Sequence, residues 1–264
     1  MPVKIKIKTL VIIVLYLVGG ALISHLISIP AGIVYIAMGV YFLYKIYPKF
    51  DLSPDIKFNK DKKIVSLTFD DGPTKGFTEE ILKVLKNKNV TASFFVLGSK
   101  IQSNVELIKK IIEQGCEIGT HTISHKKLHN ASAPEIAAEL EPAIDSIRDI
   151  YSELGKSQEF KKIFRPPHGF KNLALKRYLR SNSIKLIPWT RGVWDTDVLG
   201  SKWIIEKAIV KPMMNEIILL HDGLGLEGGS KKQKADLLEA LPKIIDFYKD
   251  NEYTFVKASS FLKE

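Results

Sequence analysis

The feature that most constrains the fold is a regular alternation of short apolar runs with helical patterns, which begins at Ile64. The apolar runs predict strands at residues 64–69, 92–96, 116–119, 163–165, 184–188, 217–221 and 253–256. The helical patterns between them cover residues 79–88, 104–113, 134–154, 172–181, 202–210 and 234–249. Because strands that alternate with helices at this spacing form parallel sheets, we expect an α/β fold, either open or closed into a barrel.

Two adjacent carboxylates, Asp70 and Asp71, follow the first predicted strand and precede a Gly-Pro turn. Neighbouring side chains of a strand leave the backbone in different directions, so one carboxylate can hold a metal while the other handles a proton. Two like charges this close are costly unless a cation or a shared proton relieves them. A turn that caps the next helix is the structural alternative.

Two histidines, His121 and His125, are four residues apart. This spacing predicts that both imidazoles lie on one face of a helical turn, as a chelating pair requires. With Asp71 they make a set of two imidazoles and one carboxylate, which leaves an open coordination position for water or substrate. Zinc is the metal that such a set favours, and cobalt, nickel and manganese accept the same ligand types.

Three further motifs follow in order: Arg165-Pro-Pro-His168-Gly, then the segment from Trp189 to Asp195, then Leu219-Leu-His-Asp-Gly. With the Asp-Asp and His-x-x-x-His motifs, this ordered set resembles the polysaccharide deacetylases of the NodB-homology type, carbohydrate esterase family four. The resemblance runs from Ile64 to near the C-terminus. It implies a distorted (β/α)7-type barrel whose active site lies at the carboxyl ends of the strands.

The resemblance also assigns the first half of the catalytic machinery. It implies that Asp70 is the catalytic base and that Arg165 orients it and keeps it ionised, a task for which a guanidinium fork with two donors is suited. It implies that the divalent metal is bound by Asp71, His121 and His125.

The second half of the machinery comes from the later motifs. The resemblance makes His221 the general acid and Asp195 the residue that holds it. It implies that the backbone N–H of His168, the residue before the third-motif glycine, donates a hydrogen bond to the oxyanion. Leu219 and Trp194 would shape a pocket for the methyl group of the acetyl substituent.

The chain departs from the family pattern at two positions. His168 replaces the usual aromatic residue, commonly Tyr, and Thr196 stands where a Trp is frequent. Arg191, in the same segment as Thr196, is able to pair with Asp195 or Asp197. We therefore expect intact chemistry with a shifted substrate specificity.

Two other polar residues of these motifs receive structural interpretations. His129 is expected to be a solvated loop residue. Asp222 is expected to cap the turn that contains Gly223 rather than to take part in catalysis.

The first 50 residues are almost continuously apolar from Leu10 to Tyr44, with no formal charge except that of His25 when it is protonated. A single helix of about 35 residues would extend roughly 52 Å, well beyond the ~30 Å hydrocarbon core of a bilayer. Pro30 divides this stretch, so we predict a membrane anchor of two transmembrane helices at residues 1–50, a polar linker at 51–63 and a catalytic domain at 64–264. A signal peptide is disfavoured because its apolar region runs only about 7–15 residues, and one span followed by an interfacial segment is a further alternative.

The lysines around this region leave the side of the membrane open. They flank both ends of the apolar stretch, and none lies between its halves. For a hairpin, positive-inside reasoning places the catalytic domain in the cytoplasm, where a lipid-linked glycan would be its substrate. A single span would place the domain outside, where it would meet wall glycan.

The charge and the composition limit the classes of partner that we expect. The net charge of +10 favours anionic surroundings, such as lipid headgroups or a phosphate-bearing glycan. The lysines are scattered and accompany no binding motif, so we predict no nucleic-acid partner, and nothing indicates an obligate protein partner. The lone Cys116 precludes an internal disulfide.

These observations predict a membrane-anchored, metal-dependent hydrolase that removes acetyl groups from the N-acetylated sugars of a peptidoglycan-like or chitin-like glycan. Related alternatives are an O-acetyl esterase and a deacetylase or deformylase of a lipid-linked aminosugar. A non-catalytic glycan-binding protein is the alternative of another class, and it would not need the acid–base residues.

Overall fold

The computed structural model describes residues 18–19, 30–38, 55–226 and 229–263. The chain divides into two compact units, Met1–Asp51 and Leu52–Glu264. In the first unit residues 30–38 are helical. None of the helices in the described ranges has both the length and the apolar character that a membrane span requires. Most of the predicted transmembrane hairpin lies outside the described residues.

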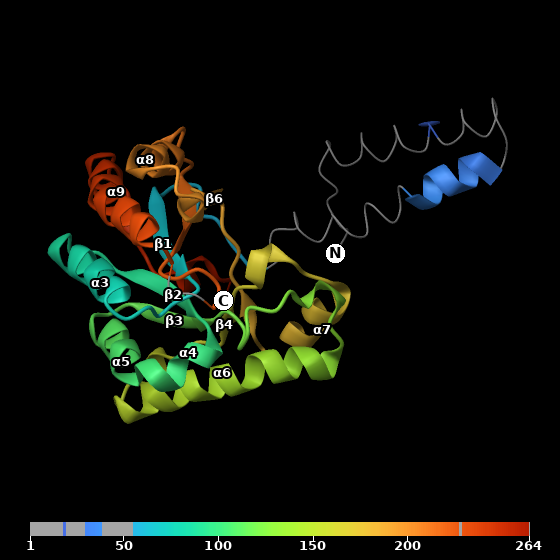
Figure 1. Cartoon of the computed structure of the whole chain (residues 1–264), viewed down its shortest axis with the longest axis horizontal. Helices are drawn as coiled ribbons and strands as arrows, with labels where there is room; N and C mark the ends of the chain where they lie inside the picture. Colours follow the sequence, from blue (N-terminus) through green and yellow to red (C-terminus); the bar gives the residue numbers. More distant parts are fainter. Residues whose placement is uncertain (1–17, 20–29, 39–54, 227–228, 264) are drawn as a thin grey trace. The chain divides into compact units, whose positions relative to one another are not determined.

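The second unit is built on a parallel sheet (Figure 1). Its strands run in the order β5-β4-β3-β2-β1-β7-β6, and β8 pairs with the start of β1. The strand bounds are β1 Ile64–Asp70, β2 Ala92–Val96, β3 Glu117–Thr120, β4 Ile163–Phe164, β5 Lys185–Leu186, β6 Arg191–Gly192, β7 Asn215–His221 and β8 Thr254–Phe255. The predicted parallel α/β architecture is therefore confirmed, while β6 was not predicted.

One short segment joins the two ends of the sheet. β5 pairs with β4 and β6 pairs with β7, although β5 and β6 belong to the same stretch of chain, 185–192. Within this stretch the Ile187 N–H donates to the Phe164 carbonyl, and the Thr190 N–H donates to the Ile217 carbonyl. The sheet is consequently curled, and its carboxyl strand ends converge on one rim.

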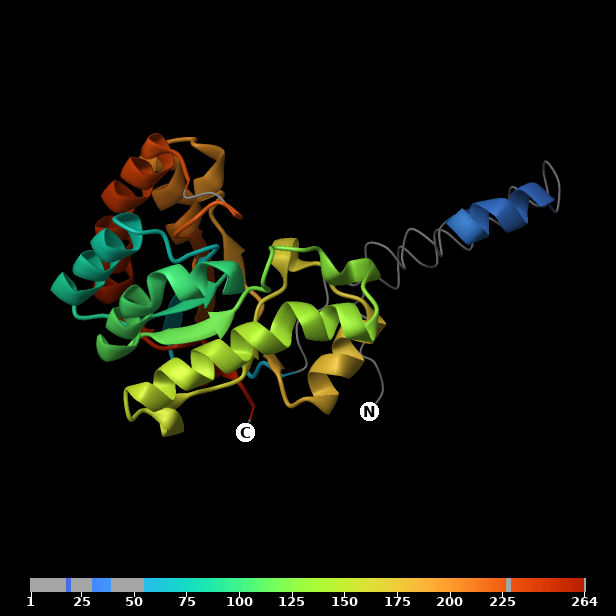
Figure 2. The ribbon, with the colours of Figure 1, turned by 60° about the horizontal axis from the view of Figure 1, so that its bottom comes forward.

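Amphipathic helices cover the outside of the curled sheet (Figure 2). Helices adjacent along the sheet contact one another: α8 with α9, α9 with α3, α5 with α6 and α6 with α7. Ser132 and Glu135 form a capping box at the start of α6, in which the Ser132 N–H donates to Glu135 Oε2 at 2.9 Å. The helix bounds are α3 Phe77–Asn87, α4 Gly98–Ile101, α5 Val105–Glu113, α6 Ala133–Glu153, α7 Leu173–Ser181, α8 Ser201–Ile209 and α9 Lys231–Asp250.

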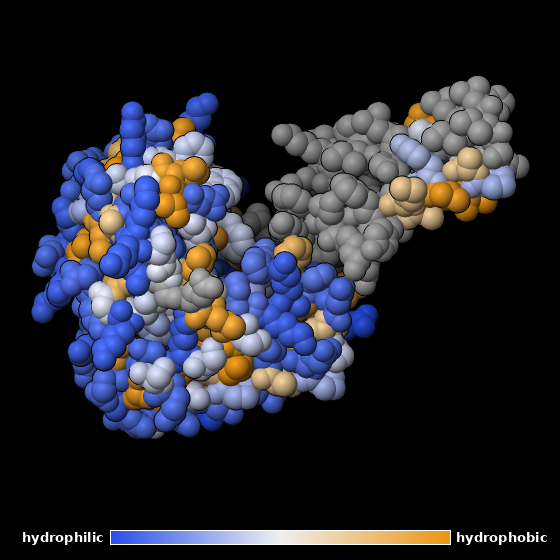
Figure 3. Space-filling view, in the orientation of Figure 1, coloured by the Kyte–Doolittle hydropathy of each residue, from blue (hydrophilic) through white to orange (hydrophobic). Residues whose placement is uncertain are grey.

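The alternation of side chains along β1 separates the core from the site. Val65, Leu67 and Phe69 are buried in the main apolar cluster, where the outer helices pack. The intervening Thr68 and Asp70 are buried too, but both accept hydrogen bonds from one buried arginine inside the curled sheet. The visible outer face of this unit is mostly hydrophilic, with separate apolar patches (Figure 3).

Part of the predicted polar linker contacts the catalytic unit. Ile56 forms an antiparallel bridge with Leu262 and is 9% exposed. Phe58 packs edge-on against Phe261 with ring centroids 6.1 Å apart. The few apolar residues of this polar stretch therefore find partners near the C-terminus.

Candidate metal centre and acid–base site

Three predicted ligands come together at the carboxyl rim of the sheet. One ligand atom each from Asp71, His121 and His125 lies within 4.8 Å of the other two. Asp71 Oδ1 is 3.4 Å from His121 Nε2 and 3.1 Å from His125 Nε2. Two imidazoles and one carboxylate are a donor set that suits a divalent transition metal.

The predicted helical turn between the two histidines is wrong. The His121 N–H donates to the Val96 carbonyl, so His121 continues the ladder of β3. Residues 121–125 then form an irregular loop, in which Thr122 and His125 have φ angles of 72° and 62°. The two histidines are therefore brought together by an irregular loop, and they do not share one face of a helix.

Asp71 is fixed so that one oxygen remains available. Its backbone has φ 72°, and its Oδ2 accepts the Gly225 N–H at 2.8 Å. The Lys100 ammonium donates to the carbonyls of both Asp71 and Gly225, at 2.7 Å and 2.9 Å. Asp71 Oδ1 is buried without a hydrogen-bond partner, which is an expensive arrangement unless a cation occupies the space.

The protonation states also fit a cation. Burial raises the pKa of Asp71, but the close approach of His125 and the nearby imidazoles of His121 and His221 outweigh it and hold the pKa far below its usual range. Burial lowers the pKa of His121, against the opposing effect of Asp70 and Asp71. His121 Nδ1 lies 2.8 Å from the Arg165 carbonyl, so a neutral ring that donates there leaves the Nε2 lone pair able to bind a cation.

Asp70 is held by a buried arginine. Arg165 Nη1 donates to Asp70 Oδ1 at 2.8 Å and to Thr68 Oγ1 at 2.7 Å. The other guanidinium donors reach the carbonyls of Ile187 and Pro188, so the expected two-donor grip on Asp70 is wrong in detail. Asp70 Oδ2 is left toward the metal centre, 3.8 Å from His121 Nε2.

His221 lies across the β1–β7 pairing, opposite Asp70. Its Nδ1 is 2.9 Å from Asp195 Oδ1, and its backbone N–H donates to Asp195 Oδ2 at 2.8 Å. Burial disfavours the charged imidazolium, but the carboxylate of Asp195 outweighs this and raises the pKa of His221 to about 9. The ring is thus held as a proton donor near neutral pH.

The rim around these buried groups is more open. His168 is exposed, with φ 56° and a ring centroid 4.8 Å from that of His125. Trp194 is 56% exposed, and Leu219 is half-buried on β7. The Asp71–His121–His125 ligand group does not include His168.

Arg191 does not pair with either aspartate suggested by its position. It forms a buried ion pair with Glu216 and donates to the carbonyls of Lys207, Val210 and Lys211. Asp195 instead turns toward His221. Arg191 therefore fastens β6 to β7 and to the end of α8, which gives it a structural role.

Of two residues near the metal centre, one was not predicted from the sequence and the other has a different role from the one predicted. Lys100 was not predicted, because no motif contains it. Asp222 is completely buried and accepts a hydrogen bond from Thr78 Oγ1 at 2.7 Å instead of capping its own turn. Burial raises the pKa of Asp222 to about 7. Its carboxylate also explains Gly72, since a Cβ there would lie 2.0 Å from Asp222 Oδ2.

His129 also differs from its expected role. It is half-buried in a short 3-10 turn, and its ring packs against Phe170 with centroids 5.0 Å apart. It is therefore part of a group of rings rather than a fully solvated side chain.

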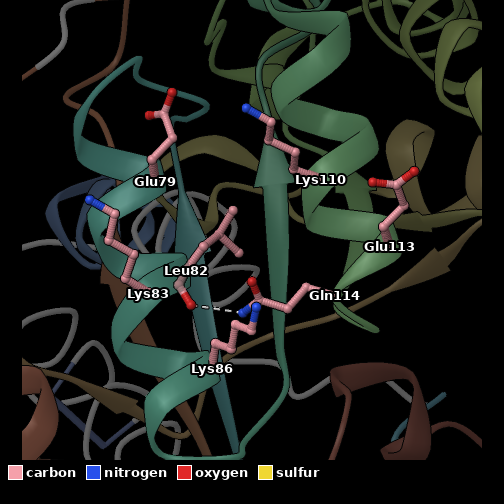
Figure 4. A pocket seen from close by; sticks show the side chains of 7 residues that line it. All are labelled: Glu79, Leu82, Lys83, Lys86, Lys110, Glu113 and Gln114. Carbon is pink, nitrogen blue, oxygen red and sulfur yellow. Dashed lines mark hydrogen bonds between the residues drawn. The ribbon is translucent and has the colours of Figure 1, made fainter.

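A groove lies between α3 and α5 (Figure 4). This groove has a volume of about 560 Å³, and the Gln114 side chain donates across it to the Leu82 carbonyl. It contains none of the ligand or acid–base residues described above. Its lining residues are Glu79, Leu82, Lys83, Lys86, Lys110, Glu113 and Gln114.

Known proteins resemble this chain in sequence and in fold. Residues 57–187 match the polysaccharide deacetylase family. The chain is 29% identical over 208 residues to the peptidoglycan-N-acetylglucosamine deacetylase of Bacillus cereus, covering 77% of this chain and 90% of that protein. It is 30% identical over 211 residues to the peptidoglycan-N-acetylmuramic acid deacetylase PdaA of Bacillus subtilis, covering 78% and 74%.

The solved structures agree. The crystal structure of the Bc1960 peptidoglycan N-acetylglucosamine deacetylase superposes with a TM-score of 0.69 at 28% identity, covering 77% of this chain and 90% of that one. The chain belongs to the polysaccharide deacetylase family, and the resemblance inferred from its motifs is confirmed.

Proposed function

We propose that this protein is a metal-dependent hydrolase that removes acetyl groups from the N-acetylated sugars of a peptidoglycan-type glycan. The observation that carries the proposal is one arrangement: the Asp71–His121–His125 group lies beside Asp70, and His221 lies across the strand pairing from Asp70. The names of the relatives support the substrate class, since both are peptidoglycan deacetylases.

Asp71, His121 and His125 are the residues that would hold the metal. Zinc is the metal we propose first, and cobalt, nickel or manganese would suit the same donors. Bound by these residues, a divalent cation would supply polarisation of the amide carbonyl and would lower the pKa of water toward ~7. The buried, unpartnered Asp71 Oδ1 is the feature of this chain that most needs such a cation.

The protein's own residues supply the proton transfers. Asp70, with Oδ1 bound to Arg165, takes a proton from the attacking water at Oδ2. His221, charged and fixed by Asp195, gives a proton to the departing amine nitrogen. The backbone N–H of His168 donates to the oxyanion, and Leu219 and Trp194 border the acetyl methyl group.

The decisive experiment compares substrates and metal states. Acetate release by the full-length chain is measured on peptidoglycan, chitooligosaccharides and lipid-linked aminosugars, with and without a chelator. We expect release from a peptidoglycan substrate that the chelator abolishes. Formate release would favour the deformylase alternative, and release only from O-acetyl esters would favour an esterase. Binding of glycan with no hydrolysis would indicate the non-catalytic alternative.

Membrane attachment is a separate proposal. It rests on the apolar composition of residues 10–44 and includes the lipid bilayer as a partner. A reporter fused to the C-terminus, active on only one side of the membrane, would identify the side of the catalytic unit. Release of the full-length chain by a salt wash would contradict an integral anchor.

A further inference from the structure

A row of aromatic rings leads away from the metal centre on the His125 side. The ring of His168 lies 4.8 Å from that of His125, and the ring of Phe170 lies 6.2 Å from that of His168. His129 continues the row, 5.0 Å from Phe170. We refer to His168, Phe170 and His129 as the aromatic ridge.

The ridge is accessible. His168 is exposed, while Phe170 and His129 are half-buried. Partly exposed rings present apolar faces on which the C–H faces of a sugar can pack, and such surfaces are typical linings of ligand sites. Because the ridge begins beside a proposed metal ligand, a chain whose one sugar reacts there can place a neighbouring sugar on these rings.

One charged group accompanies the ridge. Lys127 is exposed, and its ammonium lies 5.6 Å from the centre of the Phe170 ring. It is also close enough to His168 to help lower the pKa of that imidazole, after burial and His125. Among the described residues, no carboxylate lies within 4.0 Å of the Lys127 ammonium, so its charge is available to an anion.

The adjacent Lys126 differs from Lys127 in its ion pairing. The Lys126 ammonium is 3.0 Å from Glu135 Oε1, so its charge has a partner within the chain. A negatively charged substituent is therefore favoured beside Lys127.

We propose that the aromatic ridge is the subsite for the sugar adjoining the reacting one, and that Lys127 binds a carboxylate carried by that sugar. The inference rests on the proposed function and refines its substrate class. It predicts a preference for glycans in which N-acetylated units alternate with carboxylate-bearing units, over neutral N-acetylated homopolymers. A lysine–carboxylate contact of this exposure is a charge-assisted hydrogen bond that is partly screened by solvent.

The test uses two oligosaccharides of equal length. One is a peptidoglycan-derived glycan with carboxylate-bearing muramic acid units, and the other is a neutral chitooligosaccharide. Both kcat/KM for acetate release and Kd are measured for the full-length chain and for Lys127→Met, with Lys126→Met as the matched control. We expect Lys127→Met to weaken kcat/KM and binding about two- to fivefold for the carboxylate substrate only. Lys126→Met should leave both substrates unchanged.

Ionic strength and a ridge variant complete the experiment. The advantage of the carboxylate substrate should shrink as salt rises in the wild-type chain and be absent in Lys127→Met. Phe170→Ala should weaken both substrates, because it removes ring surface rather than charge. Equal effects of Lys127→Met on both substrates, or no effect on either, would overturn the inference.

The two proposals fail in distinguishable ways. Carboxylate-dependent binding that is lost in Lys127→Met, without acetate release from any substrate, would support the ridge and defeat the deacetylase function. Acetate release with no discrimination by Lys127 would defeat the ridge and leave the function standing. Thermal unfolding of each variant, measured alongside, separates loss of contact from loss of fold.

Discussion

The floor of the site and its rim are built in different ways. The floor residues Asp70, Arg165 and Asp195 are at most 3% exposed, and each is fixed by hydrogen bonds to other residues of the site. The rim residues His168 and Trp194 are exposed and have few fixed contacts. Buried groups whose geometry is fixed can carry charge and proton chemistry, whereas exposed groups can change with the substrate.

This difference explains where the chain departs from its family. Both departures seen in the sequence, His168 and Thr196, lie outside the buried floor, where a new side chain displaces no buried partner. The floor instead retains the full motif set. We therefore expect variants of the floor to remove activity and variants of the rim to redirect it.

The largest effect is expected for Asp70→Asn. The amide cannot accept the proton of the attacking water, so kcat should fall by about 10²–10⁴-fold while metal binding persists. Acetate release and metal content are measured on the same preparation. Asp197→Asn, which changes an exposed carboxylate near Asp195, is the control and should retain activity. Equal losses in both variants would remove the special role of Asp70.

A smaller effect is expected for Lys100→Met, which removes the hydrogen bonds to the Asp71 and Gly225 carbonyls. Because supporting contacts orient a ligand, metal affinity should fall by about 10–100-fold. Zinc titration of the metal-free protein measures it directly, with the surface variant Lys83→Met as the control. Unchanged affinity in Lys100→Met would show that the loop around Asp71 holds its shape without the lysine.

The residues of the site could be predicted from the sequence far better than the residues that hold them in place. The ordered motifs singled out Asp70, Asp71, His121, His125, Arg165, His221 and Asp195. The structure brings these residues together, and their roles stay predictions. Lys100 and Asp222 were missed or misread because their partners are distant in the sequence. Lys100 binds Asp71 and Gly225, and Asp222 binds Thr78, so only the folded chain brings them together.

The local backbone conformation also could not be predicted from the sequence. The spacing of His121 and His125 suggested a helical turn, but the strand ladder of β3 reaches His121 and tertiary contacts set the loop that follows. For example, the Ile123 N–H donates to the Glu139 carbonyl on α6. The closing segment of the sheet was predicted as one five-residue strand, 184–188, whereas two short pairings are formed, at β5 and β6. Short pairings of this kind carry too little periodicity to be read from sequence.

The pH profile tests the His221–Asp195 pair. A general acid must be protonated, and Asp195 raises the pKa of His221 to about 9, so activity should persist at mildly alkaline pH and decline above it. In Asp195→Asn the opposing effect of burial remains, so the alkaline limb should move to lower pH. The same pair stabilises the fold below the unfolded pKa of ~6.5, and this contribution is lost as pH rises through the folded pKa. An unmoved alkaline limb would contradict this assignment.

The smallest effect is expected at the rim. His168→Tyr restores the residue usual in the family and should change kcat/KM by less than about tenfold, equivalent to ~1.4 kcal/mol. Its effect should be similar on carboxylate-bearing and neutral substrates, because His168 contributes ring surface to the aromatic ridge and Lys127 contributes the charge. Zinc affinity should not change. A large loss of zinc affinity would instead make His168 a fourth ligand.

Zinc titration combined with activity tests the central claim most directly. The full-length chain is stripped with a chelator, one equivalent of zinc is returned, and acetate release is measured beside His121→Ala. We predict that stripping abolishes release, that one equivalent restores it, and that His121→Ala neither binds zinc tightly nor recovers. Release that survives chelation, or zinc binding by His121→Ala as tight as by the wild-type chain, would contradict a metal centre at Asp71, His121 and His125.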